Sequence, residues 1–174
     1  RVVEKGAEKG MKIGRKGGAK DTRTAQITEE KSKIWEDRRN ALPALARAKP
    51  TTVLEDATVP RSKIPAMVAA VNDIARKYKL EVGTFGHAGD GNLHPTILCD
   101  RRNEEEYHRV EQAVDEIFDA ALKLQGTLSG EHGIGMAKAK WMEKETNRAT
   151  IEFSKNLRRA LDPKYLFNAG KKYV

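Results

Sequence analysis

The sequence predicts an α+β fold in which an antiparallel, ferredoxin-like sheet carries helices packed on one face. Short apolar segments that read as strands alternate along the chain with longer segments whose apolar residues recur at helical spacing. A Gly-rich loop that can turn sharply joins two of the strand-like segments, which favours antiparallel pairing. The 174 residues are enough for one core and few for two, so we expect a single domain over residues 1–174.

The N-terminal part of the chain predicts two helices and one short strand. Residues 1–20 read as the end of a helix, and residues 21–27 as a short edge strand. Thr28, followed by two glutamates, is a plausible helix start, and apolar residues recur at helical spacing beyond it. Pro43 is expected to kink or break this helix.

The rest of the chain predicts the remaining strands and helices. We expect a strand over 52–60 that ends at a proline, a helix from Ser62 to Tyr78, strands over 80–85 and 96–98, and a long helix from Asn103 to Gly126. A helix over 136–142 and a last helix over 148–161 complete the prediction.

Residues that could bind a metal or transfer a proton are concentrated in two Gly-rich segments, GHAGDGNLH at 86–94 and GEHGIG at 130–135. His87 and His94 stand at the two ends of the first segment, between strand-like runs, so a rigid sheet would hold both. Two imidazoles and one carboxylate suit a divalent metal with an open position for substrate, and Glu131 is the obvious carboxylate. Imidazole ligands favour zinc or manganese over magnesium. His132 is then a possible proton acceptor beside the metal.

Two other interpretations of these segments stay open. The glycines of the first segment could form an ordinary hairpin with solvated histidines. The second segment, which opens a predicted helix, could cradle a phosphate, but it has neither the Walker spacing nor a G-x-G-x-x-G pattern. The metal interpretation is therefore favoured over the phosphate one.

Composition narrows the classes of partner and compartment. The net charge of +8 comes from basic residues scattered along the chain without interleaved aromatic residues, so we do not expect nucleic-acid binding. The single cysteine, Cys99, follows a strand-like run and is expected to be buried, which favours a reducing, cytoplasmic compartment. No apolar run approaches the roughly twenty residues that span a bilayer, so no transmembrane segment is expected.

Three longer motifs, GHAGDGNLHP, SGEHGIGMAKAKWM and ALDPKYLFNAGKKYV, resemble the C-terminal domain of FAD-linked oxidases of the vanillyl-alcohol-oxidase type. The resemblance is to the branch that contains the glycolate oxidase catalytic subunit, D-lactate dehydrogenase and D-2-hydroxyglutarate dehydrogenase, and it covers most of the chain from about Trp35 onward. It implies that His87, His94 and Glu131 hold a divalent metal. It also implies that His132 is the catalytic base.

The same resemblance assigns roles to three further residues. By spacing alone, Arg38 on the apolar side of its helix favours a surface salt bridge, whereas the W-x-x-R pattern of the family implies that it binds the substrate carboxylate. Asn168 lies in a tail that resembles the family's N-P-G-K, with alanine in place of proline, and is the candidate for a contact with the flavin edge. Glu55 stands where 2-hydroxyglutarate dehydrogenases have a lysine, so a small monocarboxylate such as glycolate or D-lactate is expected.

The function implied is the FAD-dependent, metal-assisted oxidation of a small 2-hydroxy acid to the 2-oxo acid. Because no flavin-binding loop is visible, we expect a fragment of a longer flavoenzyme, inactive alone, whose N-terminal FAD-binding domain is its partner in the same protein. The resemblance also allows an electron-transfer subunit, through which the protein could lie at a membrane. Two alternatives remain: a free-standing metal-dependent hydrolase and a non-catalytic basic binding module.

Overall fold

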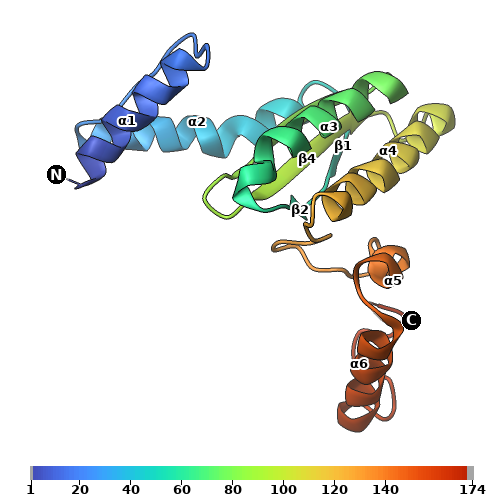
Figure 1. Ribbon diagram of the computed structural model, residues 1–174. Coiled ribbons are helices and arrows are strands. Elements are labelled where there is room, and N and C mark those ends of the chain that lie inside the picture. The colour runs from blue at the N-terminus through green and yellow to red at the C-terminus, as the bar shows by residue number, and fades with distance from the viewer. Residues whose placement is uncertain (1, 172–174) are drawn as a thin grey trace. The chain divides into compact units, whose positions relative to one another are not determined.

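The computed structural model describes residues 2–171 and divides into two compact units, with the boundary between Ala44 and Leu45. The first unit contains α1 (Val2–Lys16), an extended segment, and most of α2 (Thr28–Ala46), all visible in Figure 1. The Thr22 hydroxyl accepts a hydrogen bond from Nε of Arg15 at 3.0 Å, so the segment is held to α1 by side chains. The strand predicted at 21–27 is therefore wrong: these residues are extended but have no partner strand among the described residues.

Helix α2 begins at Thr28, as predicted, and continues through Pro43 to Ala46. The predicted break at the proline is wrong. A proline removes one backbone N–H from the helix, and because α2 ends soon afterwards this loss does not divide it. Apolar residues do recur along α2, yet none of its described side chains is buried, and Trp35 is 59% exposed.

The second unit is built around a four-stranded antiparallel sheet, made of β1 (Thr51–Leu54), β2 (Ala57–Thr58), β3 (Glu81–His87) and β4 (Asn92–Cys99). Strand β4 is central: β3 pairs along one edge, and β1 and β2 follow each other along the other. The strand predicted over 52–60 thus forms two short strands, separated at Glu55 and Asp56.

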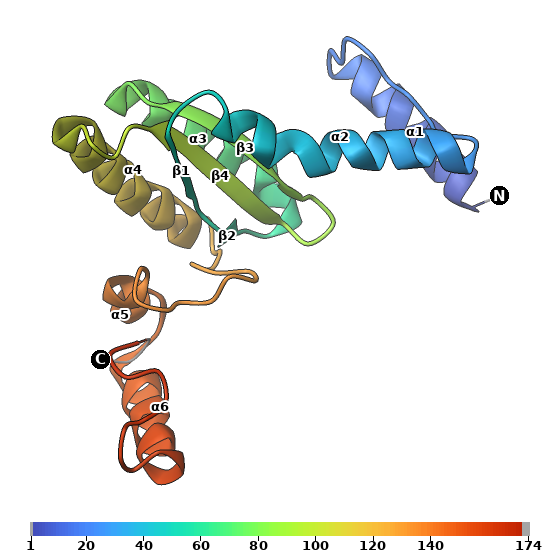
Figure 2. The same ribbon diagram turned by 180° about the vertical axis from the view of Figure 1, so that it is seen from behind.

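Two helices, α3 (Ile64–Tyr78) and α4 (Glu104–Lys123), cover one face of the sheet, and Figure 2 shows the strands in front of both. Helix α4 begins at the predicted cap, where Oδ1 of Asn103 accepts the N–H of Glu106 at 3.0 Å. Cys99 is fully buried, as predicted. The core joins alternate residues of β4 to both helices and includes Leu93, Ile97, Met67, Val71, Val110, Ile117 and Phe118. Burial of each large side chain contributes about 1.5–3 kcal/mol. The predicted α+β class, with an antiparallel sheet and helices on one face, is confirmed.

The opposite face of the sheet carries the other alternate residues of β4, among them Asn92, His94 and Thr96. Leu45, at the end of α2, covers part of this face, because a Cβ on Gly83 would lie 2.6 Å from its Cδ1 atom. His94 is therefore held in a buried strand but points away from the helix layer.

The C-terminal part contains η2 (Ala139–Trp141), α5 (Met142–Glu145) and α6 (Arg148–Leu161), while η1 (Arg61–Lys63) precedes α3. The last helix has its predicted bounds. The helix predicted at 136–142 is wrong, because turns and η2 take its place. Trp141 anchors this region by packing edge-on against Phe118, with ring centroids 4.9 Å apart. Among the described helices, none has the length and apolar character needed to cross a bilayer.

Candidate functional site

The hairpin of β3 and β4 places His87 and His94 side by side, with ring centroids 5.4 Å apart. In the turn between the strands, the N–H groups of Asp90 and Gly91 donate to the carbonyl of His87 at 2.9 and 3.0 Å. Gly91 has a φ of +78°, and a Cβ there would lie 2.0 Å from the carbonyl oxygen of Val59. Glycine is therefore required at this position.

Glu131 completes the predicted ligand set. Its Oε1 atom lies 3.0 Å from Nε2 of His94 and 3.5 Å from Nε2 of His87, and the ligand atoms of the three residues all lie within 4.8 Å of one another. Bonds of about 2.0–2.2 Å to a tetrahedral zinc place ligand atoms roughly 3.3 Å apart, which is close to the two distances from Oε1 of Glu131.

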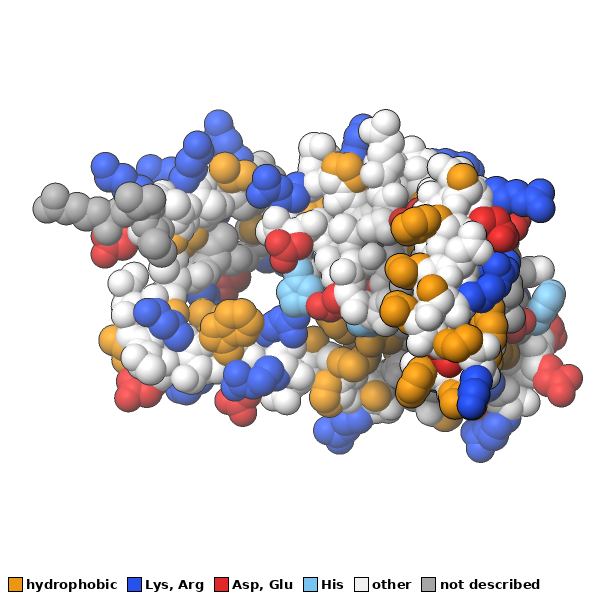
Figure 3. Space-filling model, turned by 90° about the horizontal axis from the view of Figure 1, so that it is seen from below, with side chains coloured by type: hydrophobic (Ala, Val, Ile, Leu, Met, Phe, Trp, Pro, Cys, Tyr) orange, Lys and Arg blue, Asp and Glu red, His pale blue; other side chains and the backbone are white. Residues whose placement is uncertain are grey.

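The three ligands differ in exposure. His94 is only 4% exposed, whereas the Glu131 side chain is 50% exposed and His87 is intermediate. Figure 3 shows pale blue histidine atoms next to red acidic side chains on one face of the molecule. The cluster thus has one inner ligand and an open outer side, which matches a metal site that must admit a substrate.

His132 lies beside this cluster. Its ring stacks on the ring of His94, with centroids 5.1 Å apart and an interplanar angle of 13°. Its Nε2 atom is 4.0 Å from Oε1 of Glu131. The structure therefore brings together four of the predicted site residues, with the predicted proton acceptor next to the predicted ligands.

Asp56, between β1 and β2, is a site residue that the sequence did not reveal. Its Oδ2 atom accepts the backbone N–H groups of Glu131 at 3.0 Å and His132 at 2.8 Å, and the Ser129 hydroxyl at 2.8 Å. Burial raises the pKa of Asp56, but these hydrogen bonds outweigh it and hold the pKa well below its ordinary value. In the sequence, Asp56 is marked only by the acidic pair that it forms with Glu55 inside a strand-like segment.

Lys138 is buried beside Asp56. Its ammonium group donates to the backbone carbonyls of Asp56 at 3.0 Å and Leu128 at 2.7 Å, and lies 3.7 Å from Oδ2 of Asp56. Burial lowers the pKa of Lys138, while the charges of Asp56 and Glu55 act in the opposite direction. The loop that carries Glu131 and His132 is thus fixed by buried charged groups.

Two further predicted residues, Arg38 and Asn168, belong to other parts of the chain. Arg38 belongs to the first unit, where its exposed side chain lies on α2, and its role at the substrate stays a prediction. Asn168 follows α6 with a φ of +48°, and its backbone carbonyl accepts a hydrogen bond from the Arg158 guanidinium at 3.0 Å. Asn168 lines a groove of about 600 Å³ together with Gly133 and residues of α6. Its flavin contact also stays a prediction, and residues 172–174 of the family-like tail lie outside the described residues.

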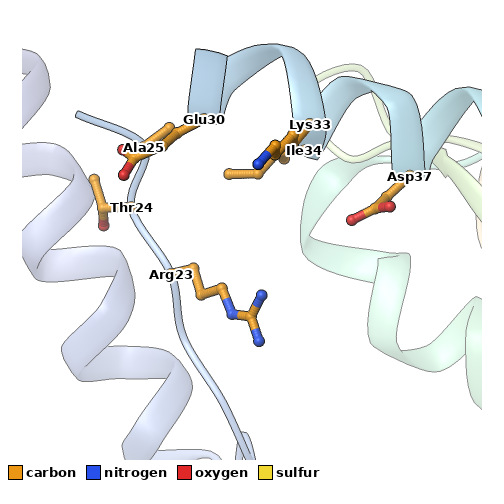
Figure 4. Close-up of a pocket in the computed structure, with 7 residues that line it drawn as sticks. All are labelled: Arg23, Thr24, Ala25, Glu30, Lys33, Ile34 and Asp37. Carbon is orange, nitrogen blue, oxygen red and sulfur yellow. The ribbon is translucent and has the colours of Figure 1, made fainter. Parts of the chain in front are cut away.

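The first unit contains a separate hollow of about 410 Å³, shown in Figure 4. Its walls are the extended residues 23–25 and the side chains of Glu30, Lys33, Ile34 and Asp37 on α2. None of the predicted site residues lines it, so the candidate site is the histidine cluster of the second unit.

Comparison with known proteins identifies sequences similar to this chain. The chain is similar to the glycolate oxidase subunit GlcD of Bacillus subtilis, at 53% identity over 99% of this chain and 37% of that protein. It is similar to the same subunit of Escherichia coli, at 36% identity over 97% of this chain and 34% of that protein. It is also similar to the D-lactate dehydrogenase of Archaeoglobus fulgidus, at 33% identity over 95% of this chain and 36% of that protein.

The chain thus spans about a third of the length of these relatives. The sequence pattern of one family, described as FAD linked oxidases, C-terminal domain, matches residues 2–172. Because this pattern covers nearly the whole chain, the chain belongs to the C-terminal domain family of the FAD linked oxidases.

Proposed function

We propose that this chain is the substrate-side domain of a FAD-dependent enzyme that oxidises a small 2-hydroxy acid, such as glycolate or D-lactate, to the 2-oxo acid. The observation that carries the proposal is the convergence of the ligand atoms of His87, His94 and Glu131 within 4.8 Å of one another. Relatives named as a glycolate oxidase subunit and a D-lactate dehydrogenase support the class of reaction. The FAD-binding domain of the same protein would be the partner of this chain, and an electron-transfer subunit a further one.

The donor set of the cluster fits a divalent transition metal. Two imidazole nitrogens and one carboxylate oxygen favour zinc or manganese, and the buried His94 provides a rigid inner ligand. Its Nε2 atom faces Glu131, 3.0 Å from Oε1, whereas its Nδ1 atom is buried without a hydrogen-bond partner in the described part of the chain. When bound, the ion supplies a Lewis acid for the substrate hydroxyl, and FAD supplies the hydride acceptor.

The residues of this chain would position the substrate and move its proton. His132, whose ring stacks on that of His94, would take the hydroxyl proton, because an imidazole can act as a general base. Arg38 would bind the carboxylate through the two parallel hydrogen bonds that a guanidinium offers. Asn168 would contribute a contact at the edge of the flavin.

The proposal is tested with the full-length protein that carries this chain. We expect it to reduce an artificial electron acceptor with glycolate or D-lactate as substrate. Chelation should abolish this turnover, and zinc or manganese should restore it. Turnover of neither acid, or full turnover after complete removal of metal, would contradict the proposal.

A further inference from the structure

The loop that carries Glu131 and His132 has no regular secondary structure between Leu128 and η2. It enters through a bridge in which the N–H of Thr127 donates to the carbonyl of Thr58 at 2.8 Å. Beyond this bridge, no helix or strand ladder fixes the backbone of Glu131. Yet a metal ligand must be held close to its working position, because freedom in the ligand reduces affinity.

The side chain of Asp56 holds this backbone. Its Oδ2 atom accepts the N–H groups of Glu131 and His132 as well as the Ser129 hydroxyl, whose oxygen in turn accepts the N–H of Gly133 at 2.7 Å. The contacts thus follow the loop from residue 129 to residue 133. The other oxygen, Oδ1, is buried and has no hydrogen-bond partner among the described residues.

Lys138 holds the carboxylate and the ends of the loop together. Its ammonium group donates hydrogen bonds to the backbone carbonyl of Asp56, between β1 and β2, and to the backbone carbonyl of Leu128, where the loop begins. It also lies 3.7 Å from Oδ2 of Asp56 and is only 4% exposed. With both charged groups buried, neither can exchange its partner for water without a large penalty.

We propose that Asp56 and Lys138 form a positioning clamp, which sets Glu131 as a metal ligand and His132 beside it. Neither residue of the clamp is a catalytic residue, since their contacts are with the loop backbone. The inference rests on the proposed function, because metal affinity is one of its readouts. Residues that orient metal ligands typically contribute about 10–100-fold to metal affinity.

Two substitutions at Asp56 separate hydrogen bonding from charge. In Asp56→Asn, the amide oxygen can take the place of Oδ2, while the amide nitrogen takes the place of Oδ1, which has no partner to lose. Asp56→Ala removes the acceptor. Asp100→Ala is the matched control, because Asp100 also accepts a backbone N–H and a guanidinium, both from Arg102, but outside the cluster. Ser129→Ala removes one link of the loop and keeps the buried pair.

The first measurement is zinc affinity, determined on metal-free full-length protein, with the cobalt(II) absorption spectrum as a report on the ligand set. Asp56→Ala should weaken zinc binding at least about tenfold. Ser129→Ala should weaken it less, Asp56→Asn should fall between the wild type and Asp56→Ala because it keeps the acceptor oxygen but removes the charge that faces Lys138, and Asp100→Ala should stay near the wild type. The clamp is overturned if Asp56→Ala keeps wild-type affinity and spectrum, or if Asp56→Asn loses as much as Asp56→Ala.

The second measurement is amide hydrogen exchange at Glu131 and His132 in the metal-free protein. Exchange there should be faster in Asp56→Ala and Ser129→Ala than in the wild type and Asp100→Ala, with α3 and α4 unchanged. If the wild type binds neither zinc nor manganese, the proposed function fails, while this measurement still decides the clamp. If Asp56→Ala does not fold, Lys138→Met, which removes the ammonium that holds Asp56 and Leu128, decides: wild-type exchange at Glu131 and His132 in that variant overturns the clamp.

Discussion

The Nε2 atom of His94 lies 3.0 Å from Oε1 of Glu131. His94 is buried in the central strand of the sheet, whereas Glu131 projects from a loop that the Asp56 carboxylate holds. The candidate site therefore depends equally on the register of the hairpin and on the anchoring of the loop.

Replacement of Gly91 by alanine should destabilise the hairpin. The residue has a positive φ, and its Cβ would meet the Val59 carbonyl, which is part of the backbone and cannot move aside cheaply. We expect the free energy of unfolding to fall by about 2 kcal/mol or more. Gly89→Ala is the control, because nothing lies within 4 Å of the added methyl group, and its effect should stay within about 1 kcal/mol. Equal losses in a denaturant titration of the two variants would contradict this account of the turn.

Substitution of Glu106 by glutamine should lower stability at neutral pH. Its carboxylate accepts hydrogen bonds from the ammonium of Lys49 at 2.7 Å and from the backbone N–H of Asp100 at 2.8 Å. The bond from Lys49 has the larger effect, and together the two bonds hold the pKa of Glu106 below its ordinary 4.5. A lowered pKa means that the ionised group stabilises the fold above pH 4.5, and that this contribution is lost as pH falls through the lowered value. We expect a deficit of about 1 kcal/mol at pH 7 that disappears in acid. Denaturation at a series of pH values measures it, and a deficit independent of pH would be the contrary result.

Arg38→Lys should impair turnover although the charge is kept. A lysine cannot offer the parallel pair of hydrogen bonds that a carboxylate accepts. Loss of one charge-assisted bond costs about 1.5–3 kcal/mol, hence at least about a tenfold fall in kcat/KM of the full-length enzyme. Arg39→Lys, the neighbouring exposed residue on α2, is the control and should have no effect. If the two variants behave alike, Arg38 does not bind the substrate.

Glu55 should disfavour substrates with a second carboxylate. It is half-buried, and although burial raises its pKa, the charge of Lys138 acts in the opposite direction and favours the ionised form. We expect glycolate or D-lactate to be turned over better than malate or 2-hydroxyglutarate. Glu55→Lys should shift the ratio of kcat/KM values towards the dicarboxylates. The ratio for Glu55→Gln should lie between those of the wild type and Glu55→Lys. A native preference for 2-hydroxyglutarate would refute this explanation.

Local sequence patterns were sufficient where a segment's apolar residues face the core. Helix α4 and the hairpin strands were predicted for this reason, whereas α6 has its predicted bounds although Ile151 is the only buried residue among its described positions. Residues 21–27 have the composition of a strand, but a strand needs a partner, and the described chain provides none. Residues 136–142 do not form the predicted helix. In this segment Lys138 and Trp141 instead make buried contacts, with Asp56 and Phe118 respectively.

The clustering of His87, His94 and Glu131 was predictable because all three lie in short Gly-rich segments of the sequence. Asp56 and Lys138 were not, because their roles depend on contacts between distant parts of the chain. The bond from Ser129 to Asp56 joins residues 73 positions apart. A buried carboxylate that accepts backbone N–H groups leaves no periodic trace in the sequence.

Metal content tests the central claim most directly. Full-length protein purified without chelator should contain about one zinc or manganese per chain by elemental analysis. The double variant His87→Ala/His94→Ala should contain none, because it lacks both imidazole ligands. His108→Ala is the control, since His108 is an exposed residue of α4, and it should retain the metal. Equal metal in the double variant and the wild type, or no metal in any of the proteins, would contradict the account.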